Sequence, residues 1–408
     1  MNLCYRCKGR GFCGHKCTIF EKLKVQKKVN LNFKQDFYGK TPNVFVGKFG
    51  YPNVNVGLLS TEQEAYKEND NPLLWSKNNY SVGKVVDLRS ELVNSSFSSN
   101  INIPRQITRN RFEELSKELS LSKKPVDTEL HLKQKPQFRL SFNQEAAPHG
   151  PNSKLEKAEA TENIRIPTKI DKAVSDYDYK AGSALSTLYK RFDEHYLTKI
   201  LSVGNLGIKT QRKLVPTRWA ITAVDDTLGK DGIKEIRDFS NNMDYTAYFG
   251  GHMGNYYIAM FFPDCWSYEL FESYLPKSVY NQGNETPYST DYESFSGRKE
   301  YAYETAGGYY AARLPVIDFL KEKKRQSSVI LLRFITSEYW APLGVWVVRE
   351  SVKKTLKTKG ITFSSKELMI EYAKKLVKKK FDVDIKRILE KSKLLNNMKN
   401  QSKLNRFF

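Results

Sequence analysis

Long apolar runs are missing from this sequence. No stretch approaches the roughly 18 consecutive apolar residues that a membrane-spanning helix needs. The first residues also lack the apolar core of a secretory signal peptide. These two absences predict a soluble protein that is intracellular, in the cytoplasm, and that has no membrane partner.

Acidic residues are also in short supply. The chain of 408 residues has 45 Asp and Glu against 67 Lys and Arg, which gives a formal net charge of +22. Such an excess of cations favours a polyanionic partner, and nucleic acid is the commonest polyanion. Disorder is excluded as a general state, because 40% of the residues are apolar and 24 Tyr and 23 Phe can fill a core. A chain of this length is expected to form two or three structural units.

Cysteine is scarce as well, and its distribution is uneven. The chain has five cysteines, of which four lie in the first seventeen residues, at Cys4, Cys7, Cys13 and Cys17. Disulfides are rare inside cells, whereas four thiolates on short glycine-containing loops suit a tetrahedral zinc ion. An iron–sulfur cluster also takes four thiolates, and a redox CxxC pair is a further alternative. We expect Zn²⁺ with a structural role, because four protein ligands leave no open position for water.

The last eight residues have the pattern of a docking peptide. In one helical turn Leu404, Phe407 and Phe408 lie at i, i+3 and i+4 and form a single apolar plug, with Gln401 one turn earlier. This Q-x-x-L-x-x-F-F spacing resembles the PCNA-interacting peptide (PIP motif), in which the plug and the glutamine fill two pockets of the sliding clamp. The alternative is a tail that folds back onto its own unit.

The two ends together resemble one family. An N-terminal CYRCKGRGFCGHKC, a long aromatic-rich body and a terminal QSKLNRFF are similar to the archaeal Nre DNA repair proteins. The resemblance implies a C4-type zinc finger at the four N-terminal cysteines and PCNA binding at the C-terminal peptide. It also implies a role in DNA repair, without a settled reaction.

An interior segment has the residue types of a nucleic-acid contact. Arg212, Lys213 and Arg218 precede or flank Trp219, which begins an apolar run. Cations of this kind contact phosphates, and an exposed indole stacks on a base in single-strand binders. We therefore interpret these four residues as a nucleic-acid-binding site.

The same segment permits an enzymatic interpretation. We expect the apolar run to be a strand that ends in Asp225 and Asp226, where paired carboxylates could hold a divalent metal or act as a base, with Asp244 or Glu300 as partner. A strand followed by an ordinary turn at Thr227–Gly229 explains the same residues without catalysis. Whether the protein is an enzyme therefore stays open.

The C-terminal region is the most basic part of the chain. Residues 351–400 hold fifteen Lys and Arg against five acids, a net charge of +10. Ser364 and Glu367 have the spacing of a capping box, and the helix they open is expected to end in Lys378, Lys379 and Lys380. The helix dipole accounts for part of this charge. We expect the rest to contact phosphate.

The expected architecture is α+β, as a multi-unit mixed fold. It comprises a C4 zinc module (1–19), an aromatic-rich body (20–290) with an optional linker at 144–163, a smaller region ending in basic helices (291–400), and the PCNA-interacting peptide (401–408). Alternation predicts a hairpin over 42–57, and apolar runs predict buried strands at 255–263, 329–335 and 345–348. Helical spacing predicts helices at 173–201 and 311–321, and Cys265 is expected in the core.

The sequence as a whole predicts a DNA repair protein that is recruited to PCNA and acts at damaged DNA. A metal-dependent nuclease, a nucleotide-using transferase and an RNA-binding or RNA-processing protein are the alternatives. The sequence has no Walker A motif or similar fingerprint that would choose among them.

Overall fold

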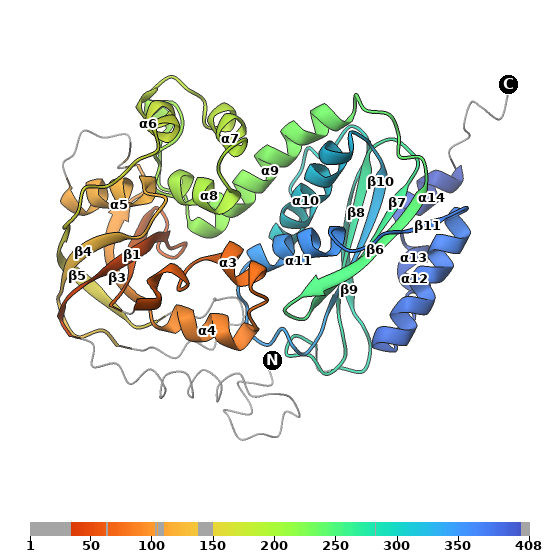
Figure 1. The fold of residues 1–408 in the computed structure, drawn as a ribbon, viewed down its shortest axis with the longest axis horizontal. Coiled ribbons are helices and arrows are strands. Elements are labelled where there is room, and N and C mark those ends of the chain that lie inside the picture. Colours follow the sequence, from red (N-terminus) through yellow and green to blue (C-terminus); the bar gives the residue numbers. More distant parts are fainter. Residues whose placement is uncertain are drawn as a thin grey trace. The chain divides into compact units, whose positions relative to one another are not determined.

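The computed structural model describes residues 34–62, 64–102, 104, 110–137, 150–281 and 283–400 (Figure 1). Their fold is α+β, as expected from the sequence. Two compact units divide between Leu228 and Gly229, and the short segment Ala341–Leu343 belongs to the first of them. The division falls inside one continuous helix, α9 (Thr217–Ile236). No helix among the described residues is long and apolar enough to cross a membrane.

The first unit is built around a closed barrel of five strands in the order β1-β2-β3-β5-β4. The neighbouring strands run antiparallel except for β3 and β5, which are parallel. The strands are β1 (Asp36–Val46), β2 (Asn53–Thr61), β3 (Val93–Asn100), β4 (Val126–Leu132) and β5 (Asn152–Ala160).

The barrel strands alternate between inward and outward side chains. In β4 the residues Val126, Thr128, Leu130 and Leu132 are buried and the residues between them are not. The inward side chains pack with Leu115 and the rest of the apolar face of α5 (Arg111–Leu121) in one hydrophobic cluster. In the described part of this unit, the other helical elements before α9 are η1 (Glu64–Lys67), α3 (Pro72–Lys77), α4 (Val82–Ser90), α6 (Thr168–Ser175), α7 (Ala181–Tyr189), α8 (Glu194–Ser202) and the 3-10 turn η3 (Lys209–Gln211).

The second unit is a six-stranded sheet in the order β11-β6-β7-β10-β8-β9, in which only the β10–β8 pair is parallel. Its centre is β10, all eight residues of which are buried. The strands are β6 (Tyr245–His252), β7 (Asn255–Phe262), β8 (Ser267–Tyr274), β9 (Tyr288–Glu293), β10 (Ser328–Ile335) and β11 (Ile361–Phe363).

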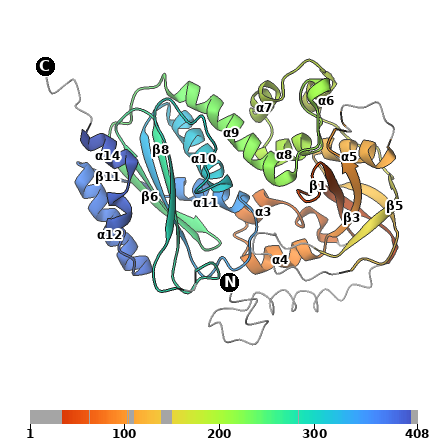
Figure 2. The ribbon, with the colours of Figure 1, turned by 180° about the vertical axis from the view of Figure 1, so that it is seen from behind.

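Helices cover both faces of this sheet. One face packs against α10 (Gly307–Lys323) and α11 (Trp346–Leu356), and the other against α12 (Lys366–Phe381), α13 (Lys386–Glu390) and α14 (Lys393–Asn400) (Figures 1 and 2). The period-two pattern of β7 produces this division, because Tyr257 and Ala259 join the first cluster and Ile258 and Met260 the second. The strands of a sheet that is buried on both faces have continuous apolar sequences, and this pattern predicted β7 and β10.

A buried carboxylate fixes the last helix to the sheet. Glu269 of β8 has no exposed surface. It accepts hydrogen bonds from the Ser392 hydroxyl (2.5 Å) and from the backbone N–H groups of Lys393 (2.9 Å) and Leu394 (3.1 Å). The side chain therefore caps the N-terminus of α14 from another element. Burial raises the pKa of this carboxyl group, and the three hydrogen bonds oppose the rise.

Several predicted elements are confirmed and others are wrong. The hairpin over 42–57 is β1 and β2, and the predicted strands 255–263 and 329–335 correspond to β7 and β10. The predicted helix 311–321 lies within α10. In contrast, the strand at 345–348 is the start of α11, the helix 173–201 is three helices, and residues 152–160 of the suggested linker form β5. Cys265 is exposed rather than in the core.

Candidate nucleic-acid interface

The turn between β1 and β2 presents two aromatic side chains to solvent. Phe49 is 69% exposed and Tyr51 is 48% exposed, although turns of this kind usually carry small polar residues. The turn is closed by a hydrogen bond from the Asn53 N–H to the Gly50 carbonyl (2.8 Å). Gly50 has φ +84°, where an added Cβ would also lie 2.5 Å from the Asn53 carbonyl oxygen. The backbone thus holds both rings outward.

The start of α9 adds a third aromatic ring to this turn. Trp219 is 47% exposed, and its ring centroid lies 5.6 Å from that of Tyr51. The Thr217 hydroxyl accepts a hydrogen bond from the backbone N–H of Val46 (2.9 Å), which ties the helix to the end of β1. We define Phe49, Tyr51 and Trp219 as the aromatic edge of the barrel. Such rings offer flat faces on which bases can stack.

The predicted cations divide into two kinds. Lys213 and Arg218 are exposed, as a phosphate contact requires. Arg212, by contrast, is only 7% exposed, and its guanidinium donates to the carbonyl oxygens of Gly207 (2.7 Å) and Val174 (2.8 Å). Burial lowers the pKa of Arg212, and the ring of Tyr177 lies 5.0 Å away. Arg212 therefore links the backbone segments around Val174 and Gly207. Its buried guanidinium is not placed to make the predicted phosphate contact.

The segment that leads to Asp225 and Asp226 is helical, so the predicted strand end is wrong. Trp219 and Ala220 donate their N–H groups to the Pro216 carbonyl, which starts α9, and the helix continues through both aspartates. Asp225 is fully buried, and adjacent residues on a helix point in different directions. Among the described residues, neither aspartate belongs to a group of three or more side chains that could hold a metal ion. The geometry on which the nuclease interpretation rested is thus absent from this segment.

The three C-terminal lysines lie in the second unit, at the end of α12. Lys378, Lys379 and Lys380 are all exposed in its last turn, and Lys378 pairs with Asp382. The helix begins one residue later than expected: Ser365, not Ser364, is the N-cap, and its hydroxyl accepts from the Leu368 N–H (3.2 Å). The cations of this helix and those near Trp219 belong to different units of the chain.

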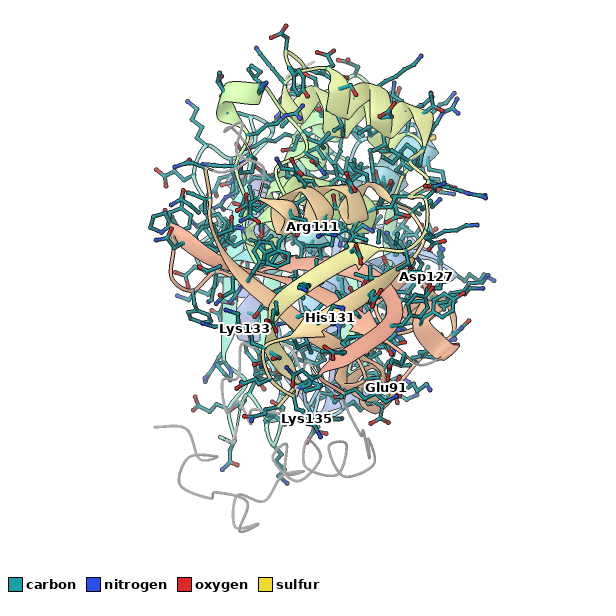
Figure 3. All side chains as sticks on the ribbon, turned by 90° about the vertical axis from the view of Figure 1, so that its left-hand side faces the viewer. Glu91, Arg111, Asp127, His131, Lys133 and Lys135 are labelled. Carbon is teal, nitrogen blue, oxygen red and sulfur yellow. The ribbon has the colours of Figure 1, made fainter. Side chains whose placement is uncertain are left out.

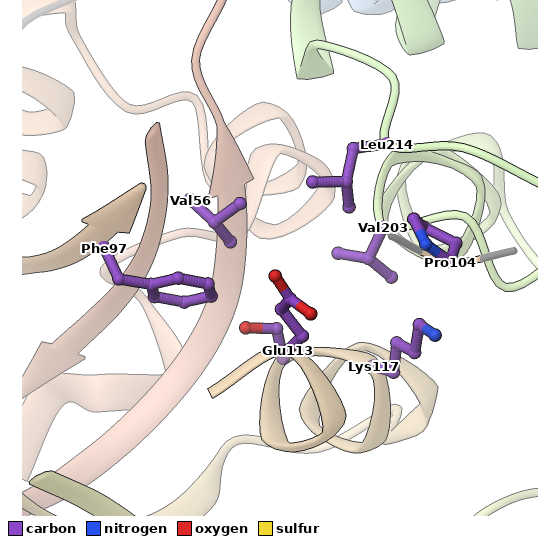
Figure 4. A pocket seen from close by; sticks show the side chains of 8 residues that line it. Val56, Phe97, Pro104, Glu113, Lys117, Val203 and Leu214 are labelled. Carbon is purple, nitrogen blue, oxygen red and sulfur yellow. The ribbon is translucent and has the colours of Figure 1, made fainter. Parts of the chain in front are cut away.

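A small cleft at one end of the barrel holds a buried carboxyl group (Figure 4). Glu113 of α5 is 7% exposed and accepts a hydrogen bond from the Ser99 hydroxyl (2.6 Å) through one oxygen. Desolvation raises the pKa of Glu113, and it lowers the pKa of the neighbouring Lys117. The remaining lining is mostly apolar, from Val56, Phe97, Pro104, Val203 and Leu214. No residue of the aromatic edge lines this cleft.

Two of the predicted sites lie outside the described residues. These are the metal ligands Cys4, Cys7, Cys13 and Cys17 and the clamp-binding residues Gln401, Leu404, Phe407 and Phe408. Sequence reasoning identified Trp219 but missed Phe49 and Tyr51. The sequence does contain a pattern that could have identified them: two aromatic residues in a glycine-containing hairpin turn do not belong to the buried face of a strand.

Comparison with known proteins gives consistent matches along the chain. The family model described as archaeal Nre, N-terminal, matches residues 12–281, and the one described as archaeal Nre, C-terminal, matches residues 293–407. A relative from Archaeoglobus fulgidus described as DNA repair protein NreA is 36% identical over 380 residues, covering 92% of this chain and 94% of the relative. DNA repair protein NreB from the same organism is 33% identical over 399 residues, with 96% of each chain covered.

A third relative comes from another organism. DNA repair protein NreA from Haloferax volcanii is 35% identical over 322 residues, covering 77% of this chain and 76% of the relative. No solved structure matches the chain.

Proposed function

Because the chain belongs to the archaeal Nre family, we propose that it is a DNA repair protein that binds DNA and is recruited to the PCNA sliding clamp by its C-terminal peptide. The names of its relatives support the repair role. The net charge of +22 supports a polyanionic partner.

The observation that carries DNA binding is the aromatic edge with its neighbouring cations. Phe49, Tyr51 and Trp219 are large apolar side chains left in solvent, and Lys213 and Arg218 are exposed close to Trp219 in sequence. Aromatic residues combined with Lys and Arg are the side chains that nucleic-acid surfaces use for stacking and phosphate contact. The exposed Lys378, Lys379 and Lys380 are a second phosphate contact in this proposal.

Clamp docking is assigned to the spacing of Gln401, Leu404, Phe407 and Phe408. The peptide presents its apolar plug to a pocket of the clamp, and the glutamine amide donates and accepts hydrogen bonds beside it. The four N-terminal cysteines are proposed to bind one Zn²⁺, which would hold their loops together rather than take part in a reaction.

Calorimetric titration of the cognate sliding clamp with the full-length protein tests the docking proposal. Binding with a micromolar or lower Kd is expected for the wild type, and Phe407→Ala combined with Phe408→Ala should abolish it. Lys403→Ala combined with Asn405→Ala is the matched control, because neither position belongs to the Q-x-x-L-x-x-F-F pattern, and it should bind like the wild type. Equal binding by the Phe407→Ala and Phe408→Ala protein would overturn the docking role of the peptide.

Two further measurements test the other parts of the proposal. Affinity for DNA should fall steeply as salt rises, because each contacted phosphate releases counterions. Affinity that does not change with salt, or no binding, would contradict DNA contact through these cations. Elemental analysis should find about one zinc per chain, and Cys7→Ser should lower it. Iron in place of zinc would replace this metal assignment.

A further inference from the structure

The barrel of the first unit has the strand order of an oligonucleotide-binding (OB) barrel. Five strands close in the order β1-β2-β3-β5-β4, with β3 and β5 parallel, and α5 lies between β3 and β4 in the chain and packs against the barrel core. In OB barrels the outer face of strands 2 and 3, together with the loops after strands 1 and 4, binds oligonucleotides or oligosaccharides. The corresponding face here consists of β2, β3 and the turn that carries Phe49 and Tyr51.

This face carries no charge, in a chain where 27% of the residues are charged. Neither β2 (NVNVGLLST) nor β3 (VNSSFSSN) contains a charged residue. Apart from Gly57 and Leu59, the outward positions are asparagine and serine: Asn55 pairs with Ser98 across the two strands, and Asn53 with Asn100. Amide and hydroxyl groups both donate and accept hydrogen bonds, which suits the edges of unpaired bases. The face also has no carboxylate that would repel a phosphate backbone.

The two rims of this face differ in character. The aromatic edge lies at the β1–β2 turn, where Asn53 opens β2. The opposite rim is where β4 ends, because β4 runs antiparallel to β1 and His131 pairs with Asp36 at the start of β1. Exposed Lys133 and Lys135 follow β4 at this rim (Figure 3), and exposed Lys154 of β5 lies beside Ser96 of β3.

The face thus runs from stacking groups at one rim to phosphate-binding groups at the other. Between Asn53 and Leu59, β2 extends for about 20 Å at its usual rise per residue. OB barrels engage about 4 to 16 nucleotides each, and the length of this face suits the low end of that range. A duplex keeps its bases stacked on one another, so the aromatic edge can be used only by a strand whose bases are unpaired.

We propose that this barrel binds single-stranded DNA across β2 and β3, with bases stacked on Phe49, Tyr51 and Trp219 and phosphates at Lys133 and Lys135. The choice of DNA over RNA rests on the proposed function, whereas the choice of a single strand rests on the barrel itself. Stacking contributes about 1–3 kcal/mol per base. Each lost ring is therefore expected to weaken binding about 5-fold to 150-fold.

The test measures fluorescence anisotropy of a labelled 20-nucleotide single strand, its duplex and the RNA of the same sequence, each with the full-length protein. The wild type should bind the DNA single strand at least tenfold more tightly than the duplex or the RNA. Phe49→Ala combined with Tyr51→Ala should weaken single-strand binding by about 100-fold and leave its salt dependence unchanged. Lys133→Ala combined with Lys135→Ala should instead reduce the slope of log affinity against log salt by about 1.4.

Tyr38→Ala is the matched control for the aromatic variants. This tyrosine is 57% exposed on the same barrel, but it lies on β1 opposite Glu129 of β4, away from β2 and β3, so binding should stay at the wild-type level. Equal circular dichroism spectra will show that all variants fold.

Three results would overturn the proposal: wild-type affinity in the Phe49→Ala and Tyr51→Ala protein, duplex binding as tight as single-strand binding, or tighter binding of RNA. Clamp titration of the same variants separates this failure from failure of the proposed function. If the protein binds the clamp and duplex DNA but does not bind a single strand through this face, the proposed repair function stands and the proposed single-strand binding by the barrel is refuted. Loss of clamp binding alone would leave the barrel's role intact.

Discussion

The buried ion pair between Arg313 of α10 and Glu293 of β9 provides a direct test of the packing in the second unit. The Arg313 Nη1 lies 2.7 Å from the Glu293 Oε2, and the two side chains are 1% and 0% exposed. The second carboxylate oxygen accepts a hydrogen bond from the Trp266 indole (3.2 Å). The substitution Glu293→Gln keeps the volume of the side chain and removes the negative charge from this buried contact.

Breaking one side of a buried pair costs about 3–5 kcal/mol, because the remaining charge stays desolvated. The matched control is Glu159→Gln. Its partner Arg111 also lies at 2.7 Å, but these two side chains are 53% and 70% exposed. An exposed pair contributes at most about 1 kcal/mol. The two substitutions therefore each remove an ion pair of the same length, one buried and one exposed.

Hydrogen exchange measured on peptides from β8–β10 and from β4–β5 is the suitable assay, because a chain of two units need not unfold in one step. Glu293→Gln should raise the opening constant of the β8–β10 amides by about 10²-fold to 5 × 10³-fold. Glu159→Gln should change that of β4–β5 by less than about fivefold. Equal effects of the two substitutions would refute the argument that burial sets the cost.

Three further predictions follow from single positions. Burial lowers the pKa of His252 from its ordinary 6.5 to about 4, so as the pH falls this histidine is protonated in the unfolded state before it is protonated in the folded state. The melting temperature should therefore fall as the pH drops from 6.5 to 4, and the fall should be smaller in His252→Gln. An equal fall in this variant would show that the pKa assignment is wrong. Gly150→Ala places a Cβ 2.0 Å from a backbone oxygen and should destabilise by about 3 kcal/mol in urea unfolding, whereas Gly83→Ala, with no atom nearer than 3.8 Å, should be neutral or stabilising. Ser365→Ala should lower the stability of α12 by about 1 kcal/mol, measured by hydrogen exchange, and Ser364→Ala should leave it unchanged; the reverse order would restore the capping box predicted from the sequence.

Local patterns in the sequence correctly predicted the elements whose residue types match the burial and conformation they have in the fold. The hairpin of β1 and β2 follows from alternation and a glycine turn, and β7 and β10 follow from short apolar runs. The same rule failed at Ala220–Val224 and at Val345–Val348, where short apolar runs are helical. A run of four or five apolar residues fits a buried strand and a buried helix face equally well, so only tertiary packing decides between them.

The barrel was missed for a different reason. Its third strand, VNSSFSSN, and its fifth, NSKLEKAEA, contain few of the residues that favour strands. Their inward positions include Ser95, Ser99 and Ser153, which are buried polar residues. Because β3 and β5 pair with partners far away in the sequence, their strand conformation depends on closure of the barrel rather than on local preference. The candidate site was therefore found only at Trp219, while Phe49 and Tyr51 acquired meaning once the strand order was known.

The capping of α14 by Glu269 sets the length of a tether. Glu269 accepts a hydrogen bond from the backbone N–H of Lys393, which is seven residues before Asn400, the last residue of that helix. Leu404 is the fourth residue after Asn400, and four residues reach at most about 14 Å. If the peptide docks as proposed, this short connection keeps the clamp close to the second unit. DNA that passes through the clamp is then present at a high local concentration around this protein.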